Sequence, residues 1–253
     1  MKHKLFSELK TWKQKALFMS MYLGQNSIEI GKALGVSDRT VRDNLQKLNY
    51  SKSDVYDPDT GSRAKILYYD IETTLAVSYH WGVWKQNLFA KQREIPSHLL
   101  SHAWAWNDGA VQGSVLTPKE VLAHDPERIV REAWELLDEC DILVAHNGKN
   151  FDVKMLNAYF LSYGLPPPSS YKVIDTLHMA KRKFRLEYNS LDFIAKYLKV
   201  TNKIVNGGID LWIGCAKGDE ESLRLMLEYN FGDITTLRDV YKKLVAWDND
   251  GVN

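Results

Sequence analysis

Residues 66–72 read Ile66-Leu67-Tyr68-Tyr69-Asp70-Ile71-Glu72, a short β-favouring run that ends in two acids. Side chains of a strand alternate between its two faces, so Asp70 and Glu72 are expected on one face and Ile71 on the other. Two acids placed side by side repel each other unless a cation or a proton lies between them. An exposed strand end is the alternative explanation for this pair taken alone.

Strand and helix patterns alternate along the chain after this run. Strand patterns cover 65–71, 75–84, 99–106 and 141–145, and helix patterns cover 127–139, 151–163, 176–183, 190–198 and 219–246. Three strand patterns precede the first long helix. This order predicts an α/β fold with a mixed sheet that begins antiparallel and is flanked by helices.

The chain before this run has a different character. The polar stretch 51–63 contains Pro58 and Gly61 and lacks apolar periodicity, which is typical of a linker. We therefore predict a helical domain at 1–50, a linker at 51–63, a larger domain at 64–247 and a tail at 248–253. Residues 1–52 hold 10 lysines and arginines against 4 acids, whereas residues 53–253 hold 23 against 28. A basic head on an acidic body suggests that the head contacts a polyanion.

The segment 28–48, IEIGKALGVSDRTVRDNLQKL, resembles a helix-turn-helix of DNA-binding proteins. Gly35 suits the end of a first helix, and Ser37 suits the cap of a second. On this interpretation Arg39 and Arg42 lie on the exposed face that meets nucleic acid. A small helical bundle that only packs or binds another protein is the alternative.

Two further segments carry acids in helical or loop settings. The first, His146-Asn147-Gly148-Lys149-Asn150-Phe151-Asp152, follows an apolar strand pattern and opens a helix at Asp152. In the second, Tyr229 and Asp233 are four residues apart and share one helical face. Taken singly, the first is explained by the helix dipole, which favours acids at a helix start, and the second by an ordinary surface helix.

Together, DIET at 70–73, HNGKNFD at 146–152 and the Y-x-x-x-D pair at 229–233 resemble the motifs of the DEDD superfamily of 3′–5′ exonucleases, which have a ribonuclease-H-like fold. The second motif is most similar to that of family B DNA polymerases. The histidine form of the third motif needs a histidine five residues before the aspartate, where this chain has Glu228, so the tyrosine subclass is expected. The resemblance covers roughly residues 65–246.

The resemblance implies roles for five residues and a cofactor of two divalent cations, Mg²⁺ or Mn²⁺. Asp70 would bridge both ions, Glu72 and Asp233 would complete the ion that holds the nucleophilic water, and Asp152 would serve the second ion. Tyr229 would orient the attacking water. Hard oxygen ligands suit these ions, and two ions about 4 Å apart supply what phosphodiester cleavage requires.

Other polar and aromatic residues are candidates for nucleic-acid contacts or for structural roles. Asn147 and Phe151 of the second motif and the basic run Lys181, Arg182 and Lys183 are candidate nucleic-acid contacts, although a solvated helix face also explains the basic run. Asp175 suits either a helix cap or a catalytic contribution. The aromatic residues between 79 and 106 favour core packing over base stacking, because they alternate along expected strands. These aromatic residues are Tyr79, Trp81, Trp84, Trp104 and Trp106.

The leading hypothesis is thus a metal-dependent 3′–5′ exonuclease acting on single-stranded DNA, with RNA as a further substrate class. The alternatives are a DNA-binding or regulatory protein with a nuclease-like scaffold, and a structure-selective endonuclease or ribonuclease that uses the same site. No run of 18 apolar residues is present, the N-terminus lacks an apolar signal core, and the two cysteines are 75 positions apart. We therefore expect no membrane partner and a cytoplasmic location. A compact nuclease with a small binding head would suit a phage or a bacterium.

Overall fold

The computed structural model describes residues 11–12, 15–16, 19, 27–37, 39–41, 64–82, 84–85, 87–200 and 208–247. The chain divides into two compact units, Met1–Ala64 and Lys65–Asn253. The predicted linker, the predicted tail and Arg42 lie outside the described residues.

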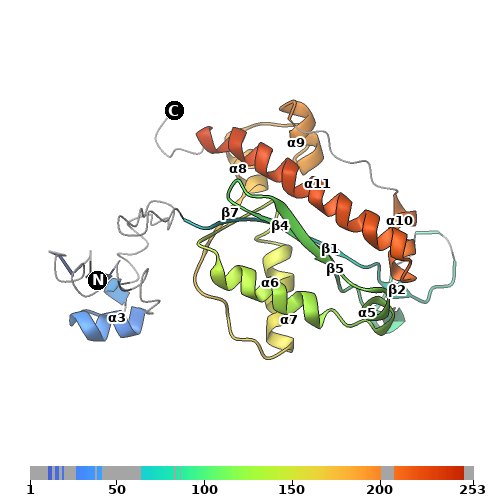
Figure 1. The fold of residues 1–253 in the computed structure, drawn as a ribbon, viewed down its shortest axis with the longest axis horizontal. Helices are drawn as coiled ribbons and strands as arrows, with labels where there is room; N and C mark the ends of the chain where they lie inside the picture. The colour runs from blue at the N-terminus through green and yellow to red at the C-terminus, as the bar shows by residue number, and fades with distance from the viewer. Residues whose placement is uncertain are drawn as a thin grey trace. The chain divides into compact units, whose positions relative to one another are not determined.

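The larger unit is built on a five-stranded mixed sheet with the strand order β5-β4-β1-β6-β7 (Figure 1). Strand β1 pairs antiparallel with β4 and parallel with β6, and β4 pairs antiparallel with β5. The mixed sheet predicted from the element order is therefore confirmed. Its strands are β1 (Ile66–Thr73), β4 (Leu99–Trp106), β5 (Val111–Val115), β6 (Ile142–Ala145) and β7 (Lys172–Asp175), and a separate pair is formed by β2 (Val77–Ser78) and β3 (Arg93–Ile95).

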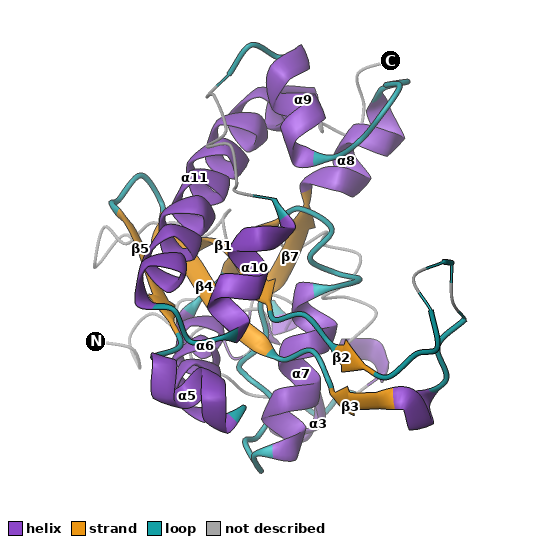
Figure 2. Ribbon diagram, turned by 90° about the vertical axis from the view of Figure 1, so that its right-hand side faces the viewer, coloured by secondary structure: helices purple, strands orange, loops and turns teal. Residues whose placement is uncertain are grey.

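Helices cover both faces of this sheet (Figures 1 and 2). Helix α11 lies on the face to which Asp70 and Ser101 point, and α6 lies on the face to which Tyr69 and His102 point. The described helices of this unit are α5 (Pro118–Ala123), α6 (Glu127–Glu139), α7 (Asp152–Ser162), α8 (Thr176–Lys183), α9 (Leu191–Tyr197), α10 (Ile209–Ala216) and α11 (Glu220–Leu244).

Local sequence signals explain where several helices begin. The Ser190 hydroxyl and the Asp219 carboxylate accept backbone N–H hydrogen bonds at the starts of α9 and α11. The buried face of α6 recurs at helical spacing, with Ile129, Ala133 and Leu137 in the core. Helix α11 approaches β5 closely at Gly113, where an added Cβ would lie 2.7 Å from a ring carbon of Phe231.

The predicted strand at 75–84 is wrong. Of the described residues in this range, only Val77–Ser78 forms a strand, and Tyr79, Trp81 and Trp84 are exposed instead of packing in the core. Trp104 is buried and Trp106 is half-buried on β4, as predicted. The alternation of aromatic residues before residue 85 therefore does not mark a buried strand.

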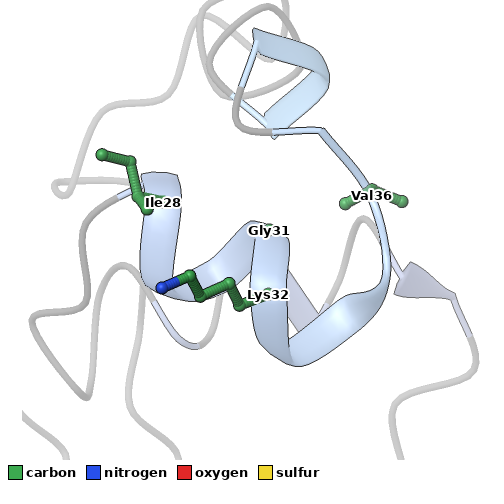
Figure 3. Close-up of a pocket in the computed structure, with 4 residues that line it drawn as sticks. All are labelled: Ile28, Gly31, Lys32 and Val36. Carbon is green, nitrogen blue, oxygen red and sulfur yellow. The ribbon is translucent and has the colours of Figure 1, made fainter.

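In the smaller unit, helix α3 (Ser27–Leu34) ends at Gly35, which has a φ of +68°. The Ser37 hydroxyl accepts a hydrogen bond from the Thr40 backbone N–H at 3.1 Å, and residues 39–41 are helical. Ile28, Gly31 and Lys32 of α3 line a shallow pocket with Val36 of the following segment (Figure 3). The turn between the helices has the predicted features, while the helix-turn-helix assignment itself stays a prediction.

Of the helices that the structure describes, none is both long enough and apolar enough to cross a membrane. Cys140 and Cys215 are buried thiols.

Candidate active site

Three carboxylates meet at the carboxyl end of β1. Asp70 and Glu72 are half-buried, whereas Tyr69 and Ile71 are buried on the other face, which is the predicted alternation. Asp233 of α11 is buried above the same strand. One carboxylate oxygen from each of Asp70, Glu72 and Asp233 lies within 4.8 Å of the others. Residues 163 positions apart in the chain thus form one acidic cluster.

A buried amide fixes the orientation of Asp70. The Asn230 side-chain N–H₂ donates to Asp70 Oδ2 at 2.7 Å, and its carbonyl oxygen accepts a hydrogen bond from the Ser101 hydroxyl at 3.1 Å. Asn230 and Ser101 are both fully buried. Because neither side chain has solvent to turn toward, this chain of hydrogen bonds restricts the Asp70 carboxylate to one rotamer.

Asp152 lies at the first position of α7 and is 3% exposed. Its carboxylate accepts hydrogen bonds from the backbone N–H groups of Asp152 itself and of Ile71, the residue between the two β1 acids. Burial raises the pKa of Asp152 to about 7, and the charge of Asp175 contributes to the rise. The fourth acid is therefore held against β1, and its ionised form is destabilised unless a positive charge approaches.

The loop before α7 is held by Asp175, the last residue of β7. Its carboxylate accepts hydrogen bonds from the backbone N–H of Asn147 at 3.0 Å and of Lys149 at 3.2 Å, and it also caps α8. Asn147 has a φ of +63°, and at Gly148 an added Cβ would lie 2.4 Å from the nearest side-chain carbon. Asp175 is thus a helix cap, which is one of the two roles predicted for it. It also positions the loop before α7.

Tyr229 is buried one turn before Asp233 on α11. Its ring meets that of Trp212, from α10, edge-on, with ring centroids 6.0 Å apart. His146 lies between α8 and the following loop, 2.9 Å from the Thr176 hydroxyl and 2.9 Å from the Asn189 carbonyl oxygen. The contacts of His146 are those of a structural residue.

The predicted nucleic-acid contacts fall in different places. Phe151 is exposed beside Asp152, at the entrance to α7, and Asn147 is half-buried in the loop before it. The basic run occupies the last turn of α8, with Lys181 and Arg182 exposed and Lys183 half-buried. Arg39 is exposed in the smaller unit.

The donor set of the acidic cluster fits a hard divalent cation. All three members are carboxylates, which are the ligands that Mg²⁺ and Mn²⁺ prefer. Asp152 adds a fourth carboxylate, which accepts a hydrogen bond from the backbone N–H of Ile71. A cation there would offset the repulsion between the acids and the burial of Asp152.

Two residues of the site, Asn230 and Ser101, are not among the residues predicted from the sequence. Asn230 has a detectable signal, because it lies three residues before Asp233 on the same helical face and asparagine is unfavourable inside helices. Ser101 has none, since its partner is 129 positions away.

Comparisons with known proteins agree with this fold. A family model described as RNase_H superfamily matches residues 67–245. A similar solved structure is that of the family B DNA polymerase from the hyperthermophilic archaeon Pyrobaculum calidifontis, with a TM-score of 0.53 and 16% identity. The similarity covers 73% of this chain and 25% of the polymerase chain, and at this identity it shows the fold alone. A comparison with curated proteins found no match.

Proposed function

The chain belongs to the RNase H superfamily, and on this basis we propose that it is a metal-dependent 3′–5′ exonuclease of the DEDD type. Its substrate is the 3′ end of single-stranded DNA. The observation that carries the proposal is the cluster of Asp70, Glu72 and Asp233, whose carboxylate oxygens lie within 4.8 Å of one another. A scaffold protein has no need of such a cluster, because it costs electrostatic repulsion without contributing to the fold.

Asp70, Glu72, Asp152 and Asp233 would hold two divalent cations, Mg²⁺ or Mn²⁺. These cations supply charge neutralisation at the phosphate, activation of a water molecule and stabilisation of the leaving oxygen. Asn230 keeps the Asp70 carboxylate in place through its 2.7 Å hydrogen bond. The chain thus contributes a preorganised anionic frame, and little movement is needed when cations and substrate arrive.

Tyr229 orients the attacking water by a hydrogen bond from its hydroxyl group. The hydroxyl acts by positioning the water and not as the base. Its edge-on contact with Trp212 supports this role, because the contact limits rotation of the ring. Phe151 and Asn147 contact the terminal nucleotides, and the basic end of α8 contacts the phosphate backbone.

The smaller unit is proposed to bind nucleic acid through a helix-turn-helix. The turn at Gly35 and the cap at Ser37 support this assignment, as does the excess of lysine and arginine in residues 1–52. Arg39 and Arg42 would contact the backbone or the groove. This unit would bring the nuclease to its substrate.

The test uses 5′-labelled single-stranded DNA and RNA of one sequence, incubated with Mg²⁺ or Mn²⁺. We expect a ladder that shortens from the 3′ end of the DNA. An Asp70→Ala, Glu72→Ala double variant and a sample with EDTA are the controls, and both should leave the substrate intact. Cleavage of a circular single strand, which has no 3′ end, would contradict this proposal and indicate an endonuclease. Preferential cleavage of RNA would indicate a ribonuclease.

A further inference from the structure

The connection between β1 and β4 carries large aromatic side chains that are exposed. Trp81 is 100% exposed and Trp84 is 83% exposed, and Tyr79 and Phe89 are largely exposed as well. We propose that this segment, the aromatic arm Val77–Ile95, binds the single-stranded part of the nucleic-acid substrate by stacking on its bases. The inference rests on the proposed function, because it names the surface that holds the strand whose end is cleaved.

Hydrogen bonds connect the two ends of the arm, although its described aromatic rings are exposed. Strands β2 and β3 pair with each other, and Gln92 ties the turn together. The Tyr79 N–H donates to the Gln92 carbonyl oxygen at 2.8 Å, and the Gln92 side chain donates to the Tyr79 carbonyl oxygen at 3.0 Å. It also accepts from the Phe89 N–H at 2.9 Å. Hydrogen bonds therefore shape this arm, and burial of the rings does not.

The arm follows the end of β1, the strand that carries Asp70 and Glu72. Val77 follows Glu72 by five residues, a distance of at most about 18 Å along an extended chain. Two hydrogen bonds join the chain just before the arm to the chain just after it. The Thr74 N–H donates to the His98 carbonyl oxygen at 2.8 Å, and the Ser97 hydroxyl donates to the Thr74 carbonyl oxygen at 2.6 Å. In Figure 2, β2, β3 and the loop between them extend away from the five-stranded sheet.

The charge of the arm differs from that of the body around it. Lys85, Lys91 and Arg93 are exposed, and the acid among them, Glu94, has a contact with Tyr79. Residues 53–253 as a whole hold 28 acids against 23 lysines and arginines. Cations between aromatic rings suit a strand of nucleic acid, since the bases stack on the rings while the phosphates meet the cations.

The chemistry selects single strands over duplexes. The faces of paired bases are already stacked on one another in a duplex, whereas unpaired bases expose them. A protein or lipid partner would favour an unbroken apolar surface, but the same arm also exposes Lys85, Asn87, Lys91 and Arg93. We therefore assign the arm to unpaired nucleotides on the 5′ side of the cleaved end.

The test measures binding and cleavage separately in the full chain. Binding of a 5′-fluorescein-labelled 20-nucleotide oligothymidylate is followed by fluorescence anisotropy in EDTA, with an unlabelled duplex as competitor. Trp81→Ala and Trp84→Ala should each weaken binding by about 5- to 150-fold, the range measured for one base–aromatic stack. Trp81→Phe should retain most of the affinity and Trp81→Leu should not. Leu161→Ala, which removes a comparably exposed apolar side chain of α7, is the matched control and should bind as the unaltered chain does.

Cleavage of a thymidine dinucleotide in Mg²⁺ provides the second readout, because a dinucleotide leaves no further bases for the arm. We expect unchanged dinucleotide cleavage and a raised KM for the oligonucleotide. Normal binding by both alanine variants would overturn the arm proposal even if the unaltered chain is an active exonuclease. Conversely, weakened binding in a chain that cleaves neither substrate would refute the proposed function and leave the arm proposal standing. Altered self-association of the variants with unchanged affinity would instead make this surface an interface between copies.

Discussion

Replacement of Asp152 by asparagine should stabilise the cation-free protein while it abolishes cleavage. Burial raises the pKa of Asp152 to about 7 from an ordinary value of 3.8. Between these two values the folded state holds a proton that the unfolded state has released, so stability falls as the pH rises through this window. At 1.36 kcal/mol per pKa unit, the loss amounts to about 2.5 kcal/mol between pH 5 and pH 8. Asparagine has the same shape and keeps the acceptor for the Ile71 N–H, but it carries no charge.

The measurement is thermal unfolding of both proteins in EDTA at pH 5 and pH 8, followed by circular dichroism. Other groups contribute to the pH dependence of stability as well, including His98 and His102, whose pKa values burial lowers. The comparison between the two proteins cancels their contribution. We expect the Tm advantage of Asp152→Asn to grow by about 5–10 °C between the two pH values, at 2–4 °C per kcal/mol.

Added Mg²⁺ should reverse the order. A cation that binds only the folded state stabilises it by about 2.7 kcal/mol at a hundredfold excess over its Kd, and the variant lacks one of the four carboxylates. A variant that is less stable than the unaltered chain at pH 8 in EDTA would refute the reasoning. So would a Tm difference that stays constant between pH 5 and pH 8.

Three other substitutions probe separate parts of the site. Asn230→Ala frees Asp70 and should lower the cleavage rate by about 10- to 100-fold, with a higher Mg²⁺ requirement in a metal titration. Tyr229→Phe keeps the ring contact with Trp212, so the protein should still fold while kcat falls by about 100-fold in steady-state assays. Gly148→Ala places a methyl group 2.4 Å from a side-chain carbon and should destabilise the fold by about 1–3 kcal/mol in denaturant titrations.

Each of these expectations can fail in its own way. If Asn230→Ala leaves the Mg²⁺ requirement unchanged, the Asn230 amide does not position the Asp70 carboxylate. Full activity of Tyr229→Phe would show that its hydroxyl has no part in the reaction. A Gly148→Ala protein as stable as the unaltered chain would mean that the loop before α7 tolerates a shift at this position.

The elements that the sequence predicts correctly are those whose signals are local. Helix α6 spans Glu127–Glu139, as its apolar periodicity predicts, and α8 and β4 also have the predicted bounds. The acids Asp70 and Glu72 share a face because the period of a strand requires it. The proximity of Asp233 to them followed from resemblance, since no local pattern joins residues 163 positions apart.

The features of the fold and the site that the sequence does not predict depend on tertiary contacts. The aromatic segment after residue 78 has the composition of a strand, but no neighbouring strand pairs with most of it, and its rings remain exposed. Strand β7 and helix α10 are short, with signals too weak to separate from loops. The link between Asp70, Asn230 and Ser101 joins three elements, and single-sequence patterns contain no information about such pairings.

The most direct test of the central claim is a Mn²⁺ titration of the full chain followed by electron paramagnetic resonance, which needs no knowledge of the substrate. The four carboxylates predict two bound Mn²⁺ per chain, and the loss of at least one in an Asp233→Ala variant that remains folded. Mg²⁺ should compete for the same sites. A folded, unaltered chain that binds no Mn²⁺, or one whose binding is unaffected by Asp233→Ala, would contradict the assignment of this cluster as a metal-dependent active site.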